Sequence, residues 1–273
     1  MDQVVRGLLR AKKAVAFTGA GISAESGIPT FRGEGGVWDK YPPSRFGNLL
    51  GLSWEWLVNP GRVKDFIKDV LEAFLQAQPN PAHLALGRLE ALRILKSVIT
   101  QNIDNLHEKG GCHKVIKIHG SLDRARCSRC GALRLMGDQG LREIVQNLEM
   151  RKGRRVGFLK WLGYLLGECE SCGGRMRPDI VFFYEALPMD AWSQAMAEAQ
   201  SCDLMLVIGT SGIVYPAAQI PFLAKRAGAE IVEINQDVSP LSRIATYRIE
   251  GPAGETMGKL FSLLESKNFR EWG

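Results

Sequence analysis

The chain has 273 residues, of which 35 are basic and 29 acidic, so its formal net charge is +6. This length suits one large domain, or one domain that carries a smaller one. No apolar run is long enough to span a bilayer, and the first residues lack the layout of a signal peptide, so we expect a cytoplasmic protein with no membrane association. Most basic residues are spread along the chain, and only one short basic cluster stands out, Arg151–Arg155. It indicates weak association with DNA or chromatin proteins at most.

A glycine-rich turn follows the first apolar run, residues 14–18, which has the length and composition of a strand. Gly19, Gly21 and Ala24 satisfy the spacing G-x-G-x-x-G/A. In this pattern the first glycine permits a tight turn, the second lets the backbone approach a pyrophosphate, and the third small residue lets a helix sit close to the sheet. The spacing alone fits an ordinary glycine-rich turn equally well, whereas the longer string that continues to Gly33 is more specific.

The rest of the chain alternates between helical and strand-like segments. Residues 34–43 have the composition of a loop, and a loop after such a turn is a natural lid, while residues 45–78 look helical. Further strands are predicted at 96–100, 115–118, 180–183, 204–208 and 231–234, and further helices at 1–13, 82–92, 190–201, 217–227 and 256–267. This rhythm predicts an α/β fold with a Rossmann-like, doubly wound parallel sheet. The cysteine pairs described next predict that a smaller zinc-binding module is inserted into it.

Four of the six cysteines form two pairs, Cys127-x-x-Cys130 and Cys169-x-x-Cys172. Each pair places two thiolates on one tight turn, and two such turns complete a tetrahedral zinc site. The site is expected to be structural, because four thiolates leave no open position for catalysis. Two redox-active pairs are the alternative.

These patterns predict three parts of the molecule. Residues 1–33, 96–120 and 178–273 are expected to form the Rossmann-like domain, and residues 34–95 the loop and helical part of a small domain. Residues 121–177 are expected to form the zinc module.

Candidate chemical groups follow the predicted strands. Asn102 and Asp104 alternate along an extended segment, so both can face one cleft, although an ordinary Asx turn is the alternative. His119 ends a strand and is followed by a glycine, so its ring can be exposed as a proton acceptor. Doubly wound sheets also form nucleotide contacts in the loops after their strands. Here Gly209, Thr210 and Ser211 follow the strand 204–208, and Asn235, Gln236 and Asp237 follow the strand 231–234.

Together these pieces resemble the sirtuins, the NAD-dependent protein lysine deacylases, from about Lys13 to about Leu260. The blocks that carry the resemblance are the string from Gly19 to Gly33, the segment Thr100–His107, His119-Gly120, both cysteine pairs, Gly209-Thr-Ser211 and Tyr215-Pro216. The sequence is most similar to the branch of microbial enzymes related to the desuccinylases.

The resemblance implies a role for each matching residue. His119 is the general base, and Asn102 also belongs to the catalytic site. Contacts with the co-substrate NAD are implied for Gly19, Ala20, Gly21, Glu25, Thr30, Phe31, Arg32, Trp38, Gln101, Asn102, Ile103, Asp104, Gly209, Thr210, Ser211, Asn235, Gln236, Asp237 and Ala253. An acyl-lysine peptide pairs with the backbone of Val181 and Phe183, and one structural Zn is held by Cys127, Cys130, Cys169 and Cys172.

The implied reaction transfers the acyl group of a modified lysine to ADP-ribose and releases nicotinamide and free lysine. Ile67 and Val70 stand where the related branch often has a Tyr-x-x-Arg pair for acidic acyl groups, and neither can pair with a carboxylate. The enzyme is therefore expected to prefer acetyl or longer apolar acyl chains to succinyl. Tyr184 stands where the family usually has glycine, which predicts an altered peptide groove. ADP-ribosyl transfer to protein and a zinc-ribbon nucleic-acid-binding protein are the alternatives.

Overall fold

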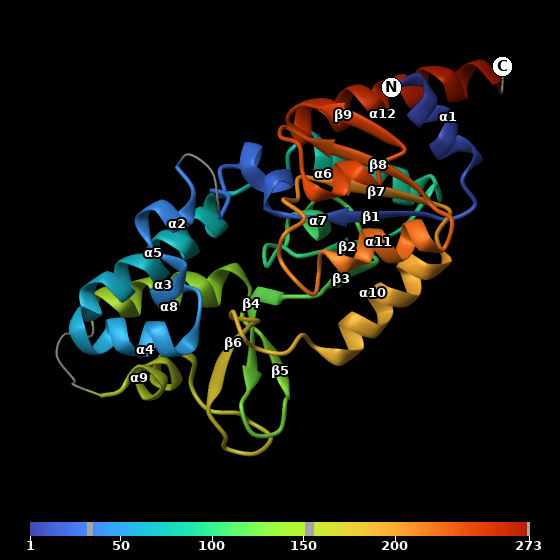
Figure 1. The fold of residues 1–273 in the computed structure, drawn as a ribbon. Coiled ribbons are helices and arrows are strands. Elements are labelled where there is room, and N and C mark those ends of the chain that lie inside the picture. Colours follow the sequence, from blue (N-terminus) through green and yellow to red (C-terminus); the bar gives the residue numbers. More distant parts are fainter. Residues whose placement is uncertain (32–34, 151–155, 272–273) are drawn as a thin grey trace. The chain divides into compact units, whose positions relative to one another are not determined.

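The computed structural model describes residues 1–31, 35–150 and 156–271. The chain forms two units, each with a sheet of its own (Figure 1). Unit 1 comprises Met1–Ile28, Gln78–His119 and Leu187–Gly273, and unit 2 comprises Pro29–Ala77 and Gly120–Ala186.

Unit 1 is built on a six-stranded sheet in the order β3-β2-β1-β7-β8-β9, in which all neighbouring strands are parallel. Its strands are β1 (Ala14–Thr18), β2 (Leu95–Thr100), β3 (Val115–Lys117), β7 (Leu204–Ile208), β8 (Glu230–Asn235) and β9 (Tyr247–Glu250). The strand order reverses between β1 and β7, which creates the switch point where open α/β sheets bind ligands. The predicted doubly wound parallel sheet is confirmed.

Helices cover both faces of this sheet (Figure 1). Ala14 and Ala16 of β1 belong to one core, whereas Val15 and Phe17 belong to the other, because successive side chains of a strand point to opposite faces. The first core includes side chains of α1 (Asp2–Arg10), α6 (Pro81–Ala91) and α12 (Ala253–Glu271), and the second those of α10 (Met189–Ser201) and α11 (Gln219–Arg226). Short elements complete the unit: α7 (Leu106–Lys109) and the 3-10 helices η1 (Ala20–Ser26) and η2 (Pro240–Arg243).

Unit 2 combines an antiparallel sheet of order β5-β4-β6 with a group of helices. Its elements are β4 (Gly120–Cys127), β5 (Leu133–Leu135), β6 (Met176–Ile180), α2 (Val37–Lys40), α3 (Pro43–Phe46), α4 (Leu49–Val58), α5 (Pro60–Gln76), α8 (Gly137–Met150) and α9 (Phe158–Leu166). Trp161 of α9 lies against Trp56 of α4, with ring centroids 4.2 Å apart. The apolar segment between the cysteine pairs therefore packs on the helical part of its own unit.

Three local expectations differ from the structure. The region expected to be helical over 45–78 is divided into α3, α4 and α5, because the side chains of Asn48 and Asn59 cap new helices by accepting from Gly51 and Arg62. The expected strand 180–183 is wrong, since β6 ends at Ile180 and belongs to the antiparallel sheet. Helix α6, assigned by sequence to the segment 34–95 of the small domain, packs in the core of unit 1 instead.

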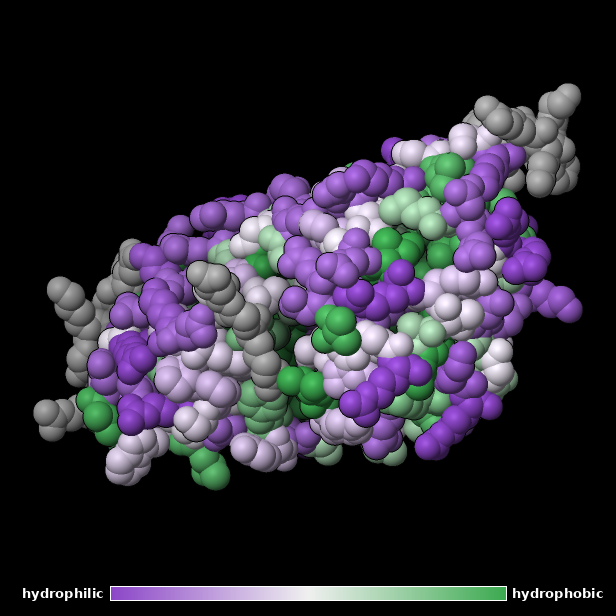
Figure 2. Space-filling view, turned by 45° about the horizontal axis from the view of Figure 1, so that its top comes forward, coloured by the Kyte–Doolittle hydropathy of each residue, from purple (hydrophilic) through white to green (hydrophobic). Residues whose placement is uncertain are grey.

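Hydrophilic side chains predominate on the face drawn in Figure 2, and hydrophobic ones lie there in small groups. Within the described part of the chain, no helix is both long and apolar enough to cross a bilayer.

Candidate active site and cysteine cluster

The glycine-rich turn after β1 packs backbone to backbone against the loop after β7. Gly21 N–H donates to the carbonyl oxygen of Gly209 at 2.8 Å, and Gly19 N–H donates to that of Ile208 at 3.1 Å. A Cβ atom on Gly21 would lie 2.8 Å from the Cα atom of Gly209. Gly209 itself has a φ of +59°, in the left-handed region that glycine tolerates. The second glycine of the motif is thus required by the neighbouring loop at the switch point.

The segment after this turn differs from the expected helix. It is the short 3-10 helix η1, which ends at Gly27 with a φ of +84°. Ala24, which the motif would place against the sheet, is exposed, whereas Ile22 and Ser23 are buried. The 3-10 geometry has three residues per turn, so the face that an α-helix would present at Ala24 falls elsewhere.

The carboxylate of Glu25 lies at the start of α12. It accepts hydrogen bonds from the backbone N–H groups of Gly254 and Glu255. A carboxylate is favourable there because the first N–H groups of a helix have no partner within the helix. Ala253, the preceding residue, is buried in the core of unit 1. Glu25 therefore ties the glycine-rich segment to the loop that begins α12.

Asn102 and Asp104 are both buried and are joined through Ser23. The Asn102 Nδ2 group donates to Ser23 Oγ at 3.1 Å, and Ser23 Oγ donates to Asp104 Oδ2 at 2.9 Å. Asp104 Oδ1 also accepts from the N–H of Leu106. This bond forms the Asx turn that the sequence analysis gave as the alternative. Burial raises the pKa of Asp104, although these hydrogen bonds partly offset the rise. The two predicted residues thus share one buried polar network.

Sequence reasoning missed two members of this network, Ser23 and His83. The Nε2 atom of His83 lies 3.5 Å from Ser23 Oγ, and its Nδ1 atom accepts from the N–H of Asn80. Because Nδ1 accepts, the neutral ring carries its proton on Nε2, directed at Ser23. Ser23 lies within the string that begins at Gly19, where the glycine spacing predicts a phosphate-binding turn but gives no signal for the serine.

His119 has a defined tautomer. Its Nδ1 atom lies 2.8 Å from the carbonyl oxygen of Gln101. A carbonyl oxygen can only accept, so Nδ1 carries the proton and the Nε2 atom of the neutral ring has an available lone pair. Burial lowers the pKa of His119, and the bond to Gln101 opposes this shift. The neutral ring is a proton acceptor at neutral pH.

The loops after β7 and β8 join the same edge of the sheet. The Gln101 side chain donates to Thr210 Oγ1 at 2.9 Å, and Asn235 Nδ2 donates to the carbonyl oxygen of Thr210 at 3.0 Å. The neighbouring residues Ser211, Gln236 and Asp237, which were also predicted to belong to the site, are exposed. Ile103 is half-buried between Asn102 and Asp104 in the sequence. Residues from four neighbouring strands therefore meet at the switch point of unit 1.

The other predicted site residues lie in unit 2. Phe31 stacks on Trp38 with ring centroids 5.2 Å apart, and Trp38 approaches Phe183 at 5.8 Å. The N–H of Val37 donates to the carbonyl oxygen of Thr30, which holds the two sides of this aromatic group together. Arg32 lies outside the described residues. Ile67 and Val70 are half-buried on α5, and Val181 follows β6.

The four paired cysteines come together in unit 2. Their sulfur atoms all lie within 4.8 Å of one another, with 3.5 Å between Cys127 and Cys172 and 3.7 Å between Cys130 and Cys169. A disulfide requires about 2.05 Å, whereas thiolates about 2.3 Å from a tetrahedral zinc ion lie roughly 3.8 Å apart. Backbone N–H groups of Cys130 and Arg129 lower the pKa of Cys127 to about 6, whereas the Cys172 and Cys127 sulfurs raise that of Cys130 to about 11, because adjacent thiols do not ionise independently. The cluster fits one zinc ion.

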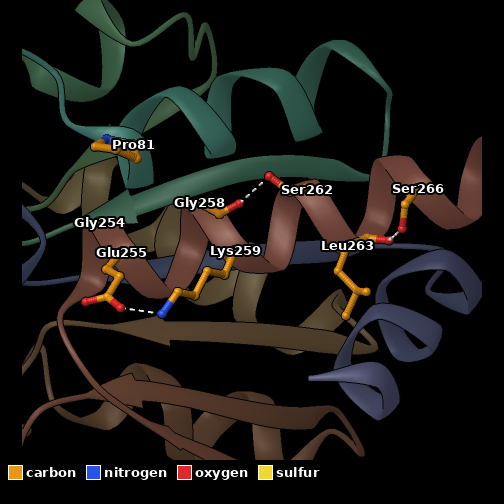
Figure 3. A pocket seen from close by; sticks show the side chains of 8 residues that line it. All are labelled: Pro81, Gly254, Glu255, Gly258, Lys259, Ser262, Leu263 and Ser266. Atoms are coloured by element: carbon orange, nitrogen blue, oxygen red, sulfur yellow. Dashed lines mark hydrogen bonds and ion pairs between the residues drawn. The ribbon is translucent and has the colours of Figure 1, made fainter.

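An open groove of about 590 Å³ runs along α12 and contains none of the predicted site residues (Figure 3). Small side chains line it at every fourth position, and the hydroxyls of Ser262 and Ser266 bond to the helix backbone. Its two charged side chains, Glu255 and Lys259, form an ion pair with each other.

Comparisons with known proteins agree with this geometry. Residues 19–216 match the Sir2 family. An NAD-dependent protein deacylase of Pyrococcus furiosus is 42% identical over 260 residues, which cover 95% of this chain and 96% of the relative. NAD-dependent protein deacylase 1 of Archaeoglobus fulgidus is 39% identical over 259 residues, covering 95% and 96%.

Solved structures agree as well. A Sir2 homologue in complex with NAD is 37% identical and has a TM-score of 0.79, over 98% of this chain and 94% of that one. A Sir2 complex with a p53 peptide and NAD⁺ is 33% identical and has a TM-score of 0.77, over 96% and 98%. The chain belongs to the Sir2 family.

Proposed function

We propose that this chain is an NAD-dependent protein lysine deacylase, which consumes NAD and one water molecule and yields nicotinamide, O-acyl-ADP-ribose and free lysine. The observation that carries the proposal is the meeting of the buried Asn102–Ser23–Asp104 network and the neutral His119 at one edge of the parallel sheet. The names of the relatives and the NAD complexes of structural neighbours support it.

The switch point of unit 1 is the proposed binding site for the two nucleotide halves of NAD. The turn at Gly19, Ala20 and Gly21 brings backbone close to the pyrophosphate, with Glu25 fixing the adjacent loop at Ala253. The adenosine half is assigned to residues after β7 and β8: Gly209, Thr210, Ser211, Asn235, Gln236 and Asp237.

Asn102 and Asp104 are assigned to the nicotinamide and its ribose, together with Gln101 and Ile103. The hydrogen bonds through Ser23 fix both side chains before ligand arrives, so less side-chain entropy is lost on binding. NAD supplies an electrophilic ribose carbon, which the acyl oxygen of the substrate attacks as nicotinamide leaves. Thr30, Phe31, Arg32 and Trp38 are assigned to the same end of NAD, where Phe31 shields this carbon from water.

His119 is assigned as the general base. With Nδ1–H held by Gln101, the Nε2 atom accepts the proton of a ribose hydroxyl, and that hydroxyl oxygen then attacks the acyl carbon. Because burial lowers the pKa of His119, the ring stays neutral at neutral pH.

Unit 2 is assigned to the acyl-lysine substrate and to the structural zinc. The N–H of Phe183 donates to the carbonyl oxygen of Gly47 at 2.8 Å, so Phe183 offers its carbonyl oxygen to an extended peptide, beside the backbone of Val181. Ile67 and Val70 provide an apolar surface for the acyl chain. The zinc ion holds the two cysteine turns together when bound.

Mass spectrometry of acetyl-, myristoyl- and succinyl-lysine peptides incubated with NAD tests the proposal. We expect O-acyl-ADP-ribose from the acetyl and myristoyl peptides, and little from the succinyl peptide. His119→Ala should abolish the product, whereas His113→Ala, at an exposed histidine, should not. Full activity of His119→Ala would refute the assigned base, and dominant desuccinylation would refute the assigned acyl preference.

Two lesser expectations belong to the same proposal. Weak association with DNA or chromatin proteins rests on Arg151–Arg155, which lies outside the described residues, and predicts binding that weakens steeply with salt. A cytoplasmic location is also proposed from the sequence alone. ADP-ribosyl transfer to protein is disfavoured because the deacylase residues Asn102, Asp104 and His119 are all present.

A further inference from the structure

Tyr184 combines two properties that folding does not explain. Its φ is +71°, a left-handed conformation that is unfavourable for residues with a Cβ atom. Its side chain is 97% exposed, so the ring has almost no packing within the chain. An unfavourable backbone conformation at an exposed aromatic residue indicates a functional role rather than a folding role.

The turn that carries Tyr184 is held firmly by its neighbours. Glu185 forms hydrogen bonds of 2.8 and 2.7 Å with the guanidinium group of Arg177, and Glu185 Oε2 also accepts from the N–H of Phe182. Burial alone would raise the pKa of Glu185, but these bonds lower it below its ordinary value, so the carboxylate stays charged.

The two aromatic residues before Tyr184 are half-buried and contact other residues of their own unit. The guanidinium carbon of Arg177 lies 5.6 Å from the ring centroid of Phe182, and Phe183 packs against Gly47 and Trp38. The N–H of Glu185 closes the turn on the carbonyl oxygen of Phe182 at 3.1 Å. The turn is therefore anchored on both sides, and it presents the ring of Tyr184 to solvent.

We propose that Tyr184 is a specificity-determining residue whose ring covers a large side chain flanking the acyl-lysine of the peptide substrate. The proposal rests on the proposed function, which places an extended peptide along Val181 and Phe183. Successive residues of an extended chain rise about 3.3 Å, so a residue one or two positions from the acyl-lysine comes within reach of a ring that follows Phe183. An exposed aromatic face gains affinity by covering aliphatic or cationic side chains.

Two acetyl-lysine peptides that differ only at the flanking positions test this contact. One has glycine at these positions and the other has leucine and arginine. For the wild-type enzyme we expect KM to be roughly two- to tenfold lower for the peptide with large flanking side chains, with similar kcat. Tyr184→Gly and Tyr184→Asn should remove this difference, since both residues tolerate the left-handed conformation but lack the ring. Tyr184→Phe should keep it.

Controls separate this role from a structural one. Tyr184→Gly should melt at or above the wild-type temperature, because strain is removed and no packing is lost. Turnover of acetyl-lysine without flanking residues should be unchanged in all three variants. Retained discrimination in Tyr184→Gly, or an equal loss on the minimal substrate, would overturn the proposal.

Fluorescence polarisation of the two labelled peptides measures the contact without turnover. The same two- to tenfold preference, lost in Tyr184→Gly, is expected there. If no peptide is deacylated by the wild-type protein, the proposed function fails, yet this binding measurement still decides whether Tyr184 makes the contact. Equal affinity of the wild-type protein for both peptides would refute it.

Discussion

Substitution of Gly21 by alanine tests whether the switch point depends on backbone contact between two loops. The new Cβ atom would lie 2.8 Å from both the Cα atom and the carbonyl oxygen of Gly209. These are backbone atoms, so they cannot rotate away as a flexible side chain would. Gly21 is outside the left-handed region, so the substitution adds no backbone strain of its own, and the effect is steric.

Overpacking of this kind costs about 1–3 kcal/mol. For a chain of this size each kcal/mol lowers the melting temperature by roughly 2–4 °C, so we expect Gly21→Ala to melt about 2–12 °C below the wild type. Gly61→Ala is the matched control, because its Cβ atom would lie 3.5 Å from Asn59 Oδ1, an ordinary contact, within α5. Alanine is the better helix former, so this control should melt at or above the wild-type temperature.

ADP-ribose is the probe for the functional part of this prediction. Saturation at about 100 times the Kd stabilises a protein by about 2.7 kcal/mol, and we expect a matching rise in the wild-type melting temperature. Gly21→Ala should lose most of this rise, whereas Gly61→Ala should keep it. A Gly21→Ala protein that melts like the wild type and responds equally to ADP-ribose would show that the loops have room to separate, and would refute the reasoning.

Three further outcomes are expected. Burial lowers the pKa of His83 to about 4, below an unfolded value of about 6.5, so this residue alone should reduce stability by about 2 kcal/mol between neutral pH and pH 5. Burial also lowers the pKa of His107 and His119, which should add to the fall, so His83→Gln should reduce the slope in urea titrations without removing it. Cys172→Ser, or a chelator, should remove one equivalent of zinc and lower the melting temperature, and an unchanged melt would contradict a structural ion. Glu25→Ala should cost about 1 kcal/mol by uncapping α12, and no loss in a thermal melt would contradict the cap.

The sheet of unit 1 was largely predictable because its central strands, such as β1, β7 and β8, are buried on both faces. Continuous apolar runs such as Leu204–Ile208 leave little choice of structure, and the predicted segment 231–234 lies within β8. The boundary at Ile180 was not predictable, since an apolar run continues to Phe183 while the pairing of β6 with β4 ends. Pairing depends on residues distant in sequence, which local composition does not record.

The site was predictable where residue type fixes the chemistry, as in the cysteine pairs that do cluster. It was not predictable where the role of a polar side chain is to form hydrogen bonds that position another polar side chain. Ser23 is an ordinary residue in sequence, yet it accepts from Asn102 and donates to Asp104. Only the approach of η1 to the segment that follows β2 gives it these partners.

The placement of Glu25 changes how anion binding at this edge should be understood. Helix α12 is the longest helix of unit 1, and its N-terminus would attract a phosphate. The carboxylate of Glu25 already accepts from two N–H groups there, and a second anion beside it would be repelled. The N–H groups of Gly19 and Gly21 are likewise engaged, by Ile208 and Gly209. In the proposed NAD complex the pyrophosphate is therefore assigned to other groups of the loops that these contacts position, and the two glycines act by letting those loops meet.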